Sequence, residues 1–257
     1  MSGAGPACVA EGQQLAARWA AATPPPSPLR RLGESTARLP DPLSESPHEP
    51  IAVPLAQGPE PEVVIVTTDS ARPAVTTWDA WADAGQTYHP LTDVELAAFA
   101  RPFPVRCGHV AVDAGCGTGP FARQLHRFGY DVTGIDFSES ALTAARRTPM
   151  VGVRYMRHDL NEGDPAGLPL HGIDLVVSRL TLPFLTNPGA WMCRIRERWL
   201  RPGGRMYVVI PVVTAQGRQP GGMTAREISN LTRGWAQAVR YELRGSLVCL
   251  ALRTTAT

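Results

Sequence analysis

Residues 110–119 read VAVDAGCGTG, a short apolar run that ends in an acid and a cluster of glycines. The apolar run is typical of a buried parallel strand. Phe121, Leu125 and Phe128 then recur at helical spacing, and Gly129 follows where a C-terminal cap belongs. Glycines permit a tight turn, and without a Cβ they let the backbone approach a ligand. The stretch therefore predicts a strand–turn–helix unit with a nucleotide-like ligand over the turn.

The segments around this turn alternate between strand-like and helix-like patterns. Apolar runs predict further strands at residues 132–135, 153–156, 173–178 and 205–211, the last after a Pro-Gly-Gly turn. Helical spacing or capping predicts helices at residues 78–84, 92–101, 138–147, 191–199 and 224–233. Repeated strand–helix units imply a parallel sheet with helices on both faces.

Two of the predicted helices begin with a capping box. Residues 92–95 and 224–227 each begin with Thr and end with Glu. In each box we expect the Thr hydroxyl to accept a hydrogen bond from a backbone N–H while the Glu side chain accepts one from the Thr N–H.

At the end of the chain, segments 239–243 and 247–252 flank a short turn and predict an antiparallel hairpin.

The N-terminal part of the chain differs in composition from the rest. Residues 1–61 contain 12 of the 25 prolines, which cannot sustain helix or sheet. A short Ala-rich helix is expected only at residues 9–22. We expect residues 1–76 to form a largely disordered extension, which is a linker, a mis-assigned start or a regulatory tail. Residues 77–257 are expected to form the domain.

Composition excludes several functions. All 25 basic residues are Arg, so the chain has no Lys for a Schiff base or for a phosphate loop. The five Cys are far apart and form no C-x-x-C pair, which indicates free thiols in the cytoplasm and no metal site. A formal net charge of +2 makes no strong case for a nucleic-acid or membrane partner. No signal peptide or apolar run of the ~18 residues that span a membrane is visible.

The glycine spacing and one acidic residue narrow the choice of ligand. Dinucleotide-binding sites have the pattern G-x-G-x-x-G, but here Pro120 occupies the position of the third glycine. Asp113 places a carboxylate at the end of the strand, where it would repel a pyrophosphate and attract a cationic amine. S-adenosylmethionine has such an ammonium group and no phosphate.

Residues 113–119, DAGCGTG, resemble the first motif of class I S-adenosylmethionine-dependent methyltransferases almost letter for letter. The resemblance continues over residues 78–253 through the segments WDAWA at 78–82, GIDFS at 134–138, HDL at 158–160, DLVVS at 174–178 and LRPGG at 200–204. It implies an α/β fold with a Rossmann-like, doubly wound sheet. The expected strand order is 3-2-1-4-5-7-6, mostly parallel, with an antiparallel C-terminal hairpin.

The resemblance also implies which residues bind the cofactor. Asp136 would accept hydrogen bonds from both ribose hydroxyls, and it lies 17 residues past Gly119, near the ~20 expected. Asp159 would accept from the adenine amine, with Leu160 beside the ring. If Asp136 and Asp159 did not follow the glycine turn in the order that this family has, they would be interpreted as solvated acids at strand ends. The residues expected to bind S-adenosylmethionine are Asp113, Gly115, Cys116, Gly117, Gly119, Asp136, Phe137, Asp159, Leu160, Ser178 and Tyr88.

Methyl transfer mainly requires alignment and exclusion of water, and no metal. A base is needed only where the acceptor must first lose a proton. No catalytic residue is assigned, and His89, beside the predicted cover segment, and His158 are the candidates. Arg179 follows the fourth strand, where the acceptor lies in this fold, and could pair with an acceptor carboxylate.

The class of the methyl acceptor is inferred from two motifs that the sequence lacks. Residues 178–184 read SRLTLPF, which does not match the Asn/Asp-Pro-Pro-aromatic turn that methylates exocyclic base amines. The Pro-Cys nucleophile of cytosine carbon methylation does not occur either. A small molecule is therefore the leading acceptor, and the oligomeric state stays open. Two alternatives compete with this hypothesis. One is a methyltransferase acting on protein or RNA. The other is a non-catalytic nucleotide-binding module or a nicotinamide-linked reductase.

Overall fold

The computed structural model describes residues 75–86, 89–103, 107–148, 150–213, 222–243 and 246–256. The helix predicted at residues 9–22 and nearly all of the predicted N-terminal extension lie outside these ranges. Tyr88 lies outside them as well. The first described helix begins at Val75, two residues before the predicted start of the domain.

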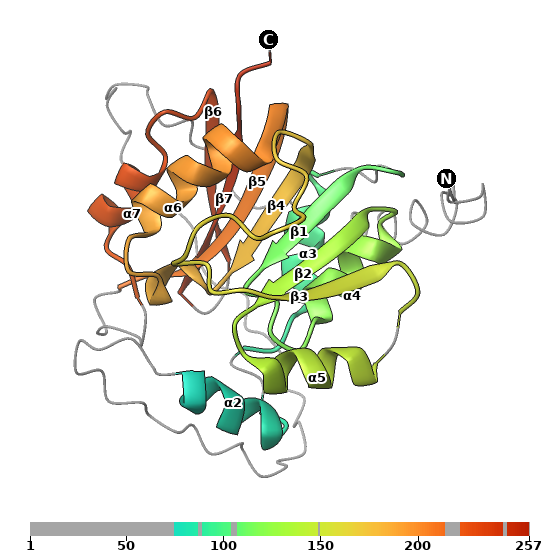
Figure 1. Ribbon diagram of the computed structural model, residues 1–257. Helices are drawn as coiled ribbons and strands as arrows, with labels where there is room; N and C mark the ends of the chain where they lie inside the picture. Colours follow the sequence, from blue (N-terminus) through green and yellow to red (C-terminus); the bar gives the residue numbers. More distant parts are fainter. Residues whose placement is uncertain are drawn as a thin grey trace, which may run out of the picture.

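The described residues form one seven-stranded sheet with the order β3-β2-β1-β4-β5-β7-β6, which confirms the predicted topology (Figure 1). Strands β1 to β5 pair in parallel, and β7 pairs antiparallel with both β5 and β6. The strands are β1 (Val110–Ala114), β2 (Asp131–Asp136), β3 (Val153–Arg157), β4 (Ile173–Arg179), β5 (Leu200–Pro211), β6 (Gln237–Leu243) and β7 (Leu247–Arg253).

Helices cover both faces of this sheet (Figure 1). They are α2 (Val75–Asp83), α3 (Asp93–Ala100), α4 (Pro120–Arg127), α5 (Glu139–Arg147), α6 (Pro188–Arg194) and α7 (Ala225–Leu231), with a 3₁₀ turn η1 (Leu182–Phe184) and a π-helix η2 (Ile195–Trp199) that continues α6. None of the helices in the described ranges is long and apolar enough to cross a membrane.

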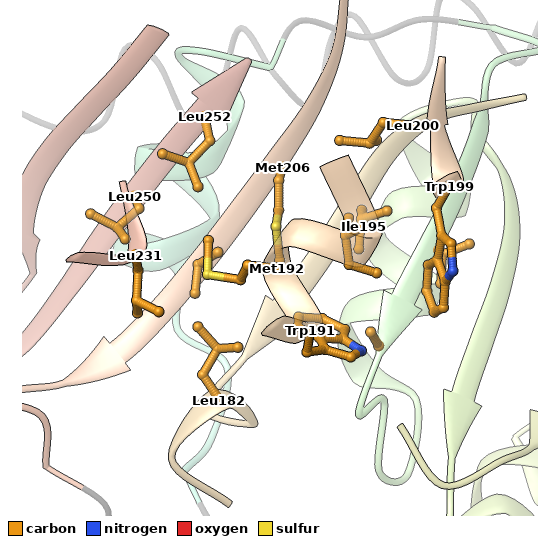
Figure 2. Packing of buried hydrophobic residues seen from close by; sticks show 14 of the residues in the cluster. Leu182, Trp191, Met192, Ile195, Trp199, Leu200, Met206, Leu231, Leu250 and Leu252 are labelled. Atoms are coloured by element: carbon orange, nitrogen blue, oxygen red, sulfur yellow. The ribbon is translucent and has the colours of Figure 1, made fainter. Parts of the chain in front are cut away.

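Two buried clusters explain why the sheet is covered on both sides. On one face Phe99 of α3 packs against Phe121 of α4 and against Tyr207 of β5, with ring centroids 5.3 and 5.0 Å apart. On the other face Trp191 of α6 and Trp199 of η2 pack with the apolar side chains of β5 and β7 (Figure 2). Because alternate residues of a strand point to opposite faces, each central strand contributes to both clusters.

Two local predictions were wrong in part. The residues of the Pro-Gly-Gly turn lie within β5, which begins at Leu200. The pairing of β4 with β5 shifts there, from Ile173 with Leu200 to Leu175 with Arg205, so that residues 201–204 stand opposite Asp174 alone. The predicted turn is therefore an irregular segment inside β5 and does not precede the strand.

The two capping boxes also differ from each other. The box at 224–227 is complete, because Thr224 accepts from the Glu227 N–H and Glu227 accepts from the Thr224 N–H. At 92–95, Thr92 accepts from the Glu95 N–H as predicted, but the Glu95 carboxylate binds Arg179 of β4 instead of reaching back. A buried charge partner thus outcompetes the local cap.

Candidate functional site

A cavity of about 180 Å³ lies where the chain leaves β1, β2, β3 and β4 at their carboxyl ends. Its wall includes the glycine turn after β1, the first residues after β2, the segment 158–160 after β3, and residues 179–181, 184 and 185 at and after the end of β4. Trp78, Trp81 and Ala82 of α2 line it from outside the sheet. In an open α/β sheet this crevice beside β1 is where ligands bind.

The three glycines of the turn serve two different purposes. Gly115 has a φ of +78°, and a Cβ on it would lie 2.1 Å from Thr181 Oγ1. Gly119, with a φ of +77°, would likewise meet the Tyr155 hydroxyl at 2.4 Å. Gly117 also has a positive φ, but a Cβ on it would meet nothing within 4 Å, and it lines the cavity. The outer two glycines therefore allow the turn to pack, and the middle one leaves open space for a ligand.

Asp136 joins the end of β2 to this turn. Its Oδ2 accepts a hydrogen bond from the Gly117 N–H at 2.8 Å, and its Oδ1 accepts from the Ser138 N–H at 3.0 Å. Burial raises the pKa of the carboxyl group, while the hydrogen bonds from Ser138 and Gly117 act to lower it. A carboxylate oxygen has more than one acceptor direction, so Asp136 can still accept from a ligand in the cavity.

Asp113 lies beneath the turn rather than in the cavity wall. It is 1% exposed, and its Oδ2 has no hydrogen-bond partner among the described residues. Burial raises the pKa of Asp113 to about 7, with Arg179 acting against this rise and Asp136 adding to it. The carboxyl group is thus a buried acid whose charge depends on what binds nearby.

The end of β3 supplies Asp159 and Leu160 to the cavity, with Asn161 beside them. Asp159 Oδ1 accepts from the Asn161 N–H at 3.0 Å and from Asn161 Nδ2 at 2.7 Å, which orients the carboxylate. Leu160 is 6% exposed. His158 also lines the cavity, but its Nε2 lies 3.0 Å from the Gly163 carbonyl oxygen, to which it can only donate.

Helix α2 is attached to the sheet through α5, beside which it lies in Figure 1. The Ser138 hydroxyl donates to Asp79 Oδ1 at 2.5 Å and accepts from the Ala141 N–H at 3.0 Å. Asp79 Oδ1 also accepts from the Ser140 N–H at 3.4 Å, so it supplies an acid at the N-terminus of α5. No role was predicted for Asp79 from the sequence, although it stands in the WDAWA segment.

The β4 end of the cavity is held by an ion pair that was not predicted from the sequence. Arg179 donates from Nε to Glu95 Oε1 at 2.6 Å and from Nη2 to Glu95 Oε2 at 3.0 Å. Arg179 also donates to the carbonyl oxygens of His89 at 2.8 Å and Pro90 at 3.2 Å. The charge of Arg179 is therefore already paired with Glu95. This corrects the expectation that Arg179 could pair with the carboxylate of an acceptor.

Aromatic rings line the same end. The ring centroid of Trp78 lies 5.1 Å from that of Phe184 in η1 and 5.7 Å from that of Trp81, both edge to face. Phe184 follows β4 and α2 precedes β1, so this contact joins two distant segments across the cavity. Leu182, next to Phe184, is fully buried and does not line the cavity.

The structure brings most of the predicted cofactor residues into one cavity wall. Those that line it are Gly115, Cys116, Gly117, Asp136, Phe137, Asp159 and Leu160, together with the two candidate bases His89 and His158. Three others lie behind the wall: Asp113, Gly119 and Ser178. Ser178 is fully buried, and its hydroxyl has no hydrogen-bond partner in the part of the chain that the structure describes. Tyr88 lies outside the described residues. In the described ranges, no three His, Cys, Asp or Glu side chains are grouped so that they could hold a metal ion.

Comparisons with known proteins agree with this geometry. Residues 112–208 match the family model of a methyltransferase domain. The malonyl-[acyl-carrier protein] O-methyltransferase of Pectobacterium atrosepticum is 34% identical over 103 residues, 39% of this chain and 38% of that protein. The ubiquinone biosynthesis O-methyltransferase of Caulobacter vibrioides is 29% identical over 126 residues, 46% of this chain and 48% of that protein. The chain spans less than half the length of these two relatives.

Solved structures share the fold. An S-adenosylmethionine-dependent methyltransferase from Mesorhizobium loti superposes with a TM-score of 0.51 at 24% identity, covering 62% of this chain and 97% of that one. Phosphoethanolamine N-methyltransferase 2 from Haemonchus contortus, in complex with S-adenosyl-L-methionine, superposes with a TM-score of 0.56 at 17% identity, covering 73% of this chain and 59% of that one.

Proposed function

We propose that this chain, which carries a class I S-adenosylmethionine-dependent methyltransferase domain, transfers the methyl group of S-adenosylmethionine to a small-molecule acceptor. The observation that supports this most directly is the position of Gly117. It sits at a positive φ with open space above it, and its N–H donates to the carboxylate of Asp136. A backbone turn and an acid from the next strand therefore meet at one cavity.

The residues of this cavity fit the cofactor. The glycine turn offers backbone without side chains to the amino-acid part, and Asp136 retains acceptor capacity for the ribose hydroxyls. Asp159 and Leu160 offer an acceptor and an apolar surface to the purine. The buried Asp113 carboxyl, close enough to Arg179 and Asp136 for its pKa to respond to both, favours a cationic ligand group. The Asp113 carboxyl beneath the glycine turn disfavours a pyrophosphate there when it is ionised, which argues against a nicotinamide dinucleotide.

The chemistry needs little from the protein beyond position. When bound, the cofactor supplies a methyl group that its sulfonium already makes electrophilic. The chain holds the two reactants in line and keeps water out, and orientation of this kind contributes on the order of 7–11 kcal/mol. Helix α2, tied by Asp79 to Ser138, provides the wall that excludes water.

A small acceptor fits the walls better than a macromolecule does. The β4 end of the cavity is lined by Trp78, Trp81 and Phe184 and closed from outside by α2. The relatives with O-methyltransferase names act in ubiquinone biosynthesis or on malonyl-[acyl-carrier protein]. We place the domain at residues 77–257, and the free thiols of the described cysteines support a cytoplasmic location.

Calorimetry tests the proposal. S-adenosylmethionine should bind the full chain with one site, S-adenosylhomocysteine should compete for it, and NADH should give no heat. Binding of NADH without binding of S-adenosylmethionine would mean that the domain serves a reductase and that the proposed transfer is wrong.

A further inference from the structure

The cavity has two chemically different ends. The end formed after β2 and β3 carries the acids Asp136 and Asp159, to which the proposed function assigns the cofactor's nucleoside. The end formed after β4 carries His89, Arg179 and Phe184. The acceptor must approach from this second end, because the first is taken by the cofactor.

Among the described residues, the second end has an apolar, aromatic lining, and its charged side chain, Arg179, is paired with Glu95. Glu95 binds the Arg179 guanidinium through both carboxylate oxygens, and the two side chains are 4% and 13% exposed. Trp78 and Phe184 meet edge to face across the opening. Such a lining suits a flat aromatic molecule, and it offers no cation to an acceptor carboxylate.

Among the described residues that line this end, His89 is the one with a basic imidazole side chain. Its carbonyl oxygen accepts from Arg179 Nη1 at 2.8 Å, so the ion pair with Glu95 fixes the backbone that carries the imidazole. The ring lines the cavity. Burial, and then the charge of Arg179, hold the pKa of His89 below its ordinary value, while Glu95 acts in the opposite direction. The imidazole is therefore neutral near pH 7.

A neutral base matters for one class of acceptor in particular. A phenolic hydroxyl has a pKa near 10 and is protonated at neutral pH, so it must lose its proton during transfer. A carboxylate has no such proton to lose, and an aromatic amine is uncharged at neutral pH and attacks through its lone pair.

We propose, on the basis of the proposed function, that His89 is the general base for an aromatic hydroxyl acceptor held against Trp78, Trp81 and Phe184, so that the reaction is an O-methylation. The acceptor oxygen forms a bond to the methyl carbon while the sulfur–carbon bond breaks and its electron pair stays on sulfur. The hydroxyl proton passes to the His89 ring, which then releases it to water.

Three probes with one ring system test the acceptor class: 2-naphthol, 2-naphthoate and 2-naphthylamine, each with labelled S-adenosylmethionine and the full chain. We expect 2-naphthol to be methylated at least about tenfold faster than the other two. Faster transfer to the carboxylate or to the amine would overturn the proposal. Binding of S-adenosylmethionine without transfer to any probe would also overturn it but would leave the proposed function standing, whereas absence of cofactor binding would end both.

The role of His89 is tested by His89→Gln, with His171→Asn as the matched control. His171 is exposed, lies away from the cavity and has a φ of 55°, which Asn tolerates. We expect His89→Gln to lower kcat for 2-naphthol about 100-fold or more. The KM for 2-naphthol and the Kd for S-adenosylmethionine should change less than about threefold. His171→Asn should behave as the parent protein.

A pH profile and NMR separate a base from a structural residue. In the parent protein kcat/KM should fall as the pH falls through the pKa of His89, below the ordinary histidine value, and His89→Gln should lack this limb. The limb should coincide with the NMR titration of the His89 ring in the ligand-free protein. A loss of kcat that follows His158→Gln instead, or a His89→Gln variant that raises KM at unchanged kcat, would show that His89 is not the base.

Discussion

The two ends of the cavity are built in different ways. The glycine-turn end consists of short segments that directly follow β1, β2 and β3, and its contacts join neighbouring strands, such as Gly117 with Asp136. The β4 end depends on pairs that lie far apart in the chain. Arg179 binds Glu95 and His89, which precede it by 84 and 90 residues. The first end is a local motif repeated at adjacent strand ends, and the second exists only once the whole domain has folded.

The largest expected effect concerns stability at the β4 end. Replacing Glu95 with Ala would leave Arg179 buried without its charge partner, and breaking a buried pair in this way costs about 3–5 kcal/mol. Chemical denaturation of the ligand-free protein measures the loss.

The matched control for Glu95→Ala is Glu139→Ala. Glu139 pairs with Arg146 at 2.7 Å, but both side chains are about half exposed, so its loss should cost no more than about 1 kcal/mol. Equal losses for the two variants would mean that the β4 end is no more dependent on its ion pair than an ordinary surface is.

The next effect lies beneath the glycine turn. Burial raises the pKa of Asp113 to about 7 in the folded protein, against 3.8 for the free side chain, so the folded state binds more protons between these values. Stability contributed by protonated Asp113 is complete below pH 3.8 and is lost as the pH rises through 7. The Asn side chain of Asp113→Asn has no proton to lose in this range. The free energy of unfolding of the variant, minus that of the parent protein, should therefore increase with pH by no more than about 4 kcal/mol.

Urea titrations of both proteins from about pH 4 to about pH 8.5, in the absence of ligand, measure this difference. Titrating groups that do not interact with Asp113 contribute equally in the two proteins and cancel, whereas Asp136, whose charge acts on Asp113, contributes to the measured difference. A difference that stays constant over this range would show that Asp113 is ionised throughout and that the turn stabilises its charge.

The smallest effect is one of binding at the glycine-turn end. Asp136→Ala should weaken the affinity for S-adenosylmethionine at least about tenfold, which corresponds to ~1.4 kcal/mol. The loss has two causes: the ribose acceptor disappears, and the Gly117 N–H loses the partner that holds the turn.

Asp131→Ala is the control, because Asp131 is exposed and stands at the opposite end of the same strand. Calorimetry at a single pH compares the two variants with the parent chain. An unchanged affinity in Asp136→Ala would remove the ribose role from Asp136.

The sequence predicted the secondary structure of the central sheet closely, because buried parallel strands and capped helices depend on local patterns. The predicted strand at 153–156 extends by one residue, and Ser138 caps α5 as the helix predicted from 138 requires. The errors occur where a distant group intervenes. Glu95 has the spacing of a capping residue, but Arg179 binds its carboxylate. Residues 202–204 have the composition of a turn, but they lie within β5, where its pairing with β4 is irregular.

By itself, the sequence determined the glycine turn and the acids at the next two strand ends, because each of these is specified within a short stretch of chain. The strand order was expected from the resemblance of these motifs, in their order along the chain, to the methyltransferase family. The tertiary structure alone decided that Asp113 is buried behind the cavity wall, that Arg179 is already neutralised, and that Trp78 meets Phe184. The physical reason is that charge pairing and burial depend on which side chains are close in space, and segments far apart in the chain carry no local pattern that records their contact.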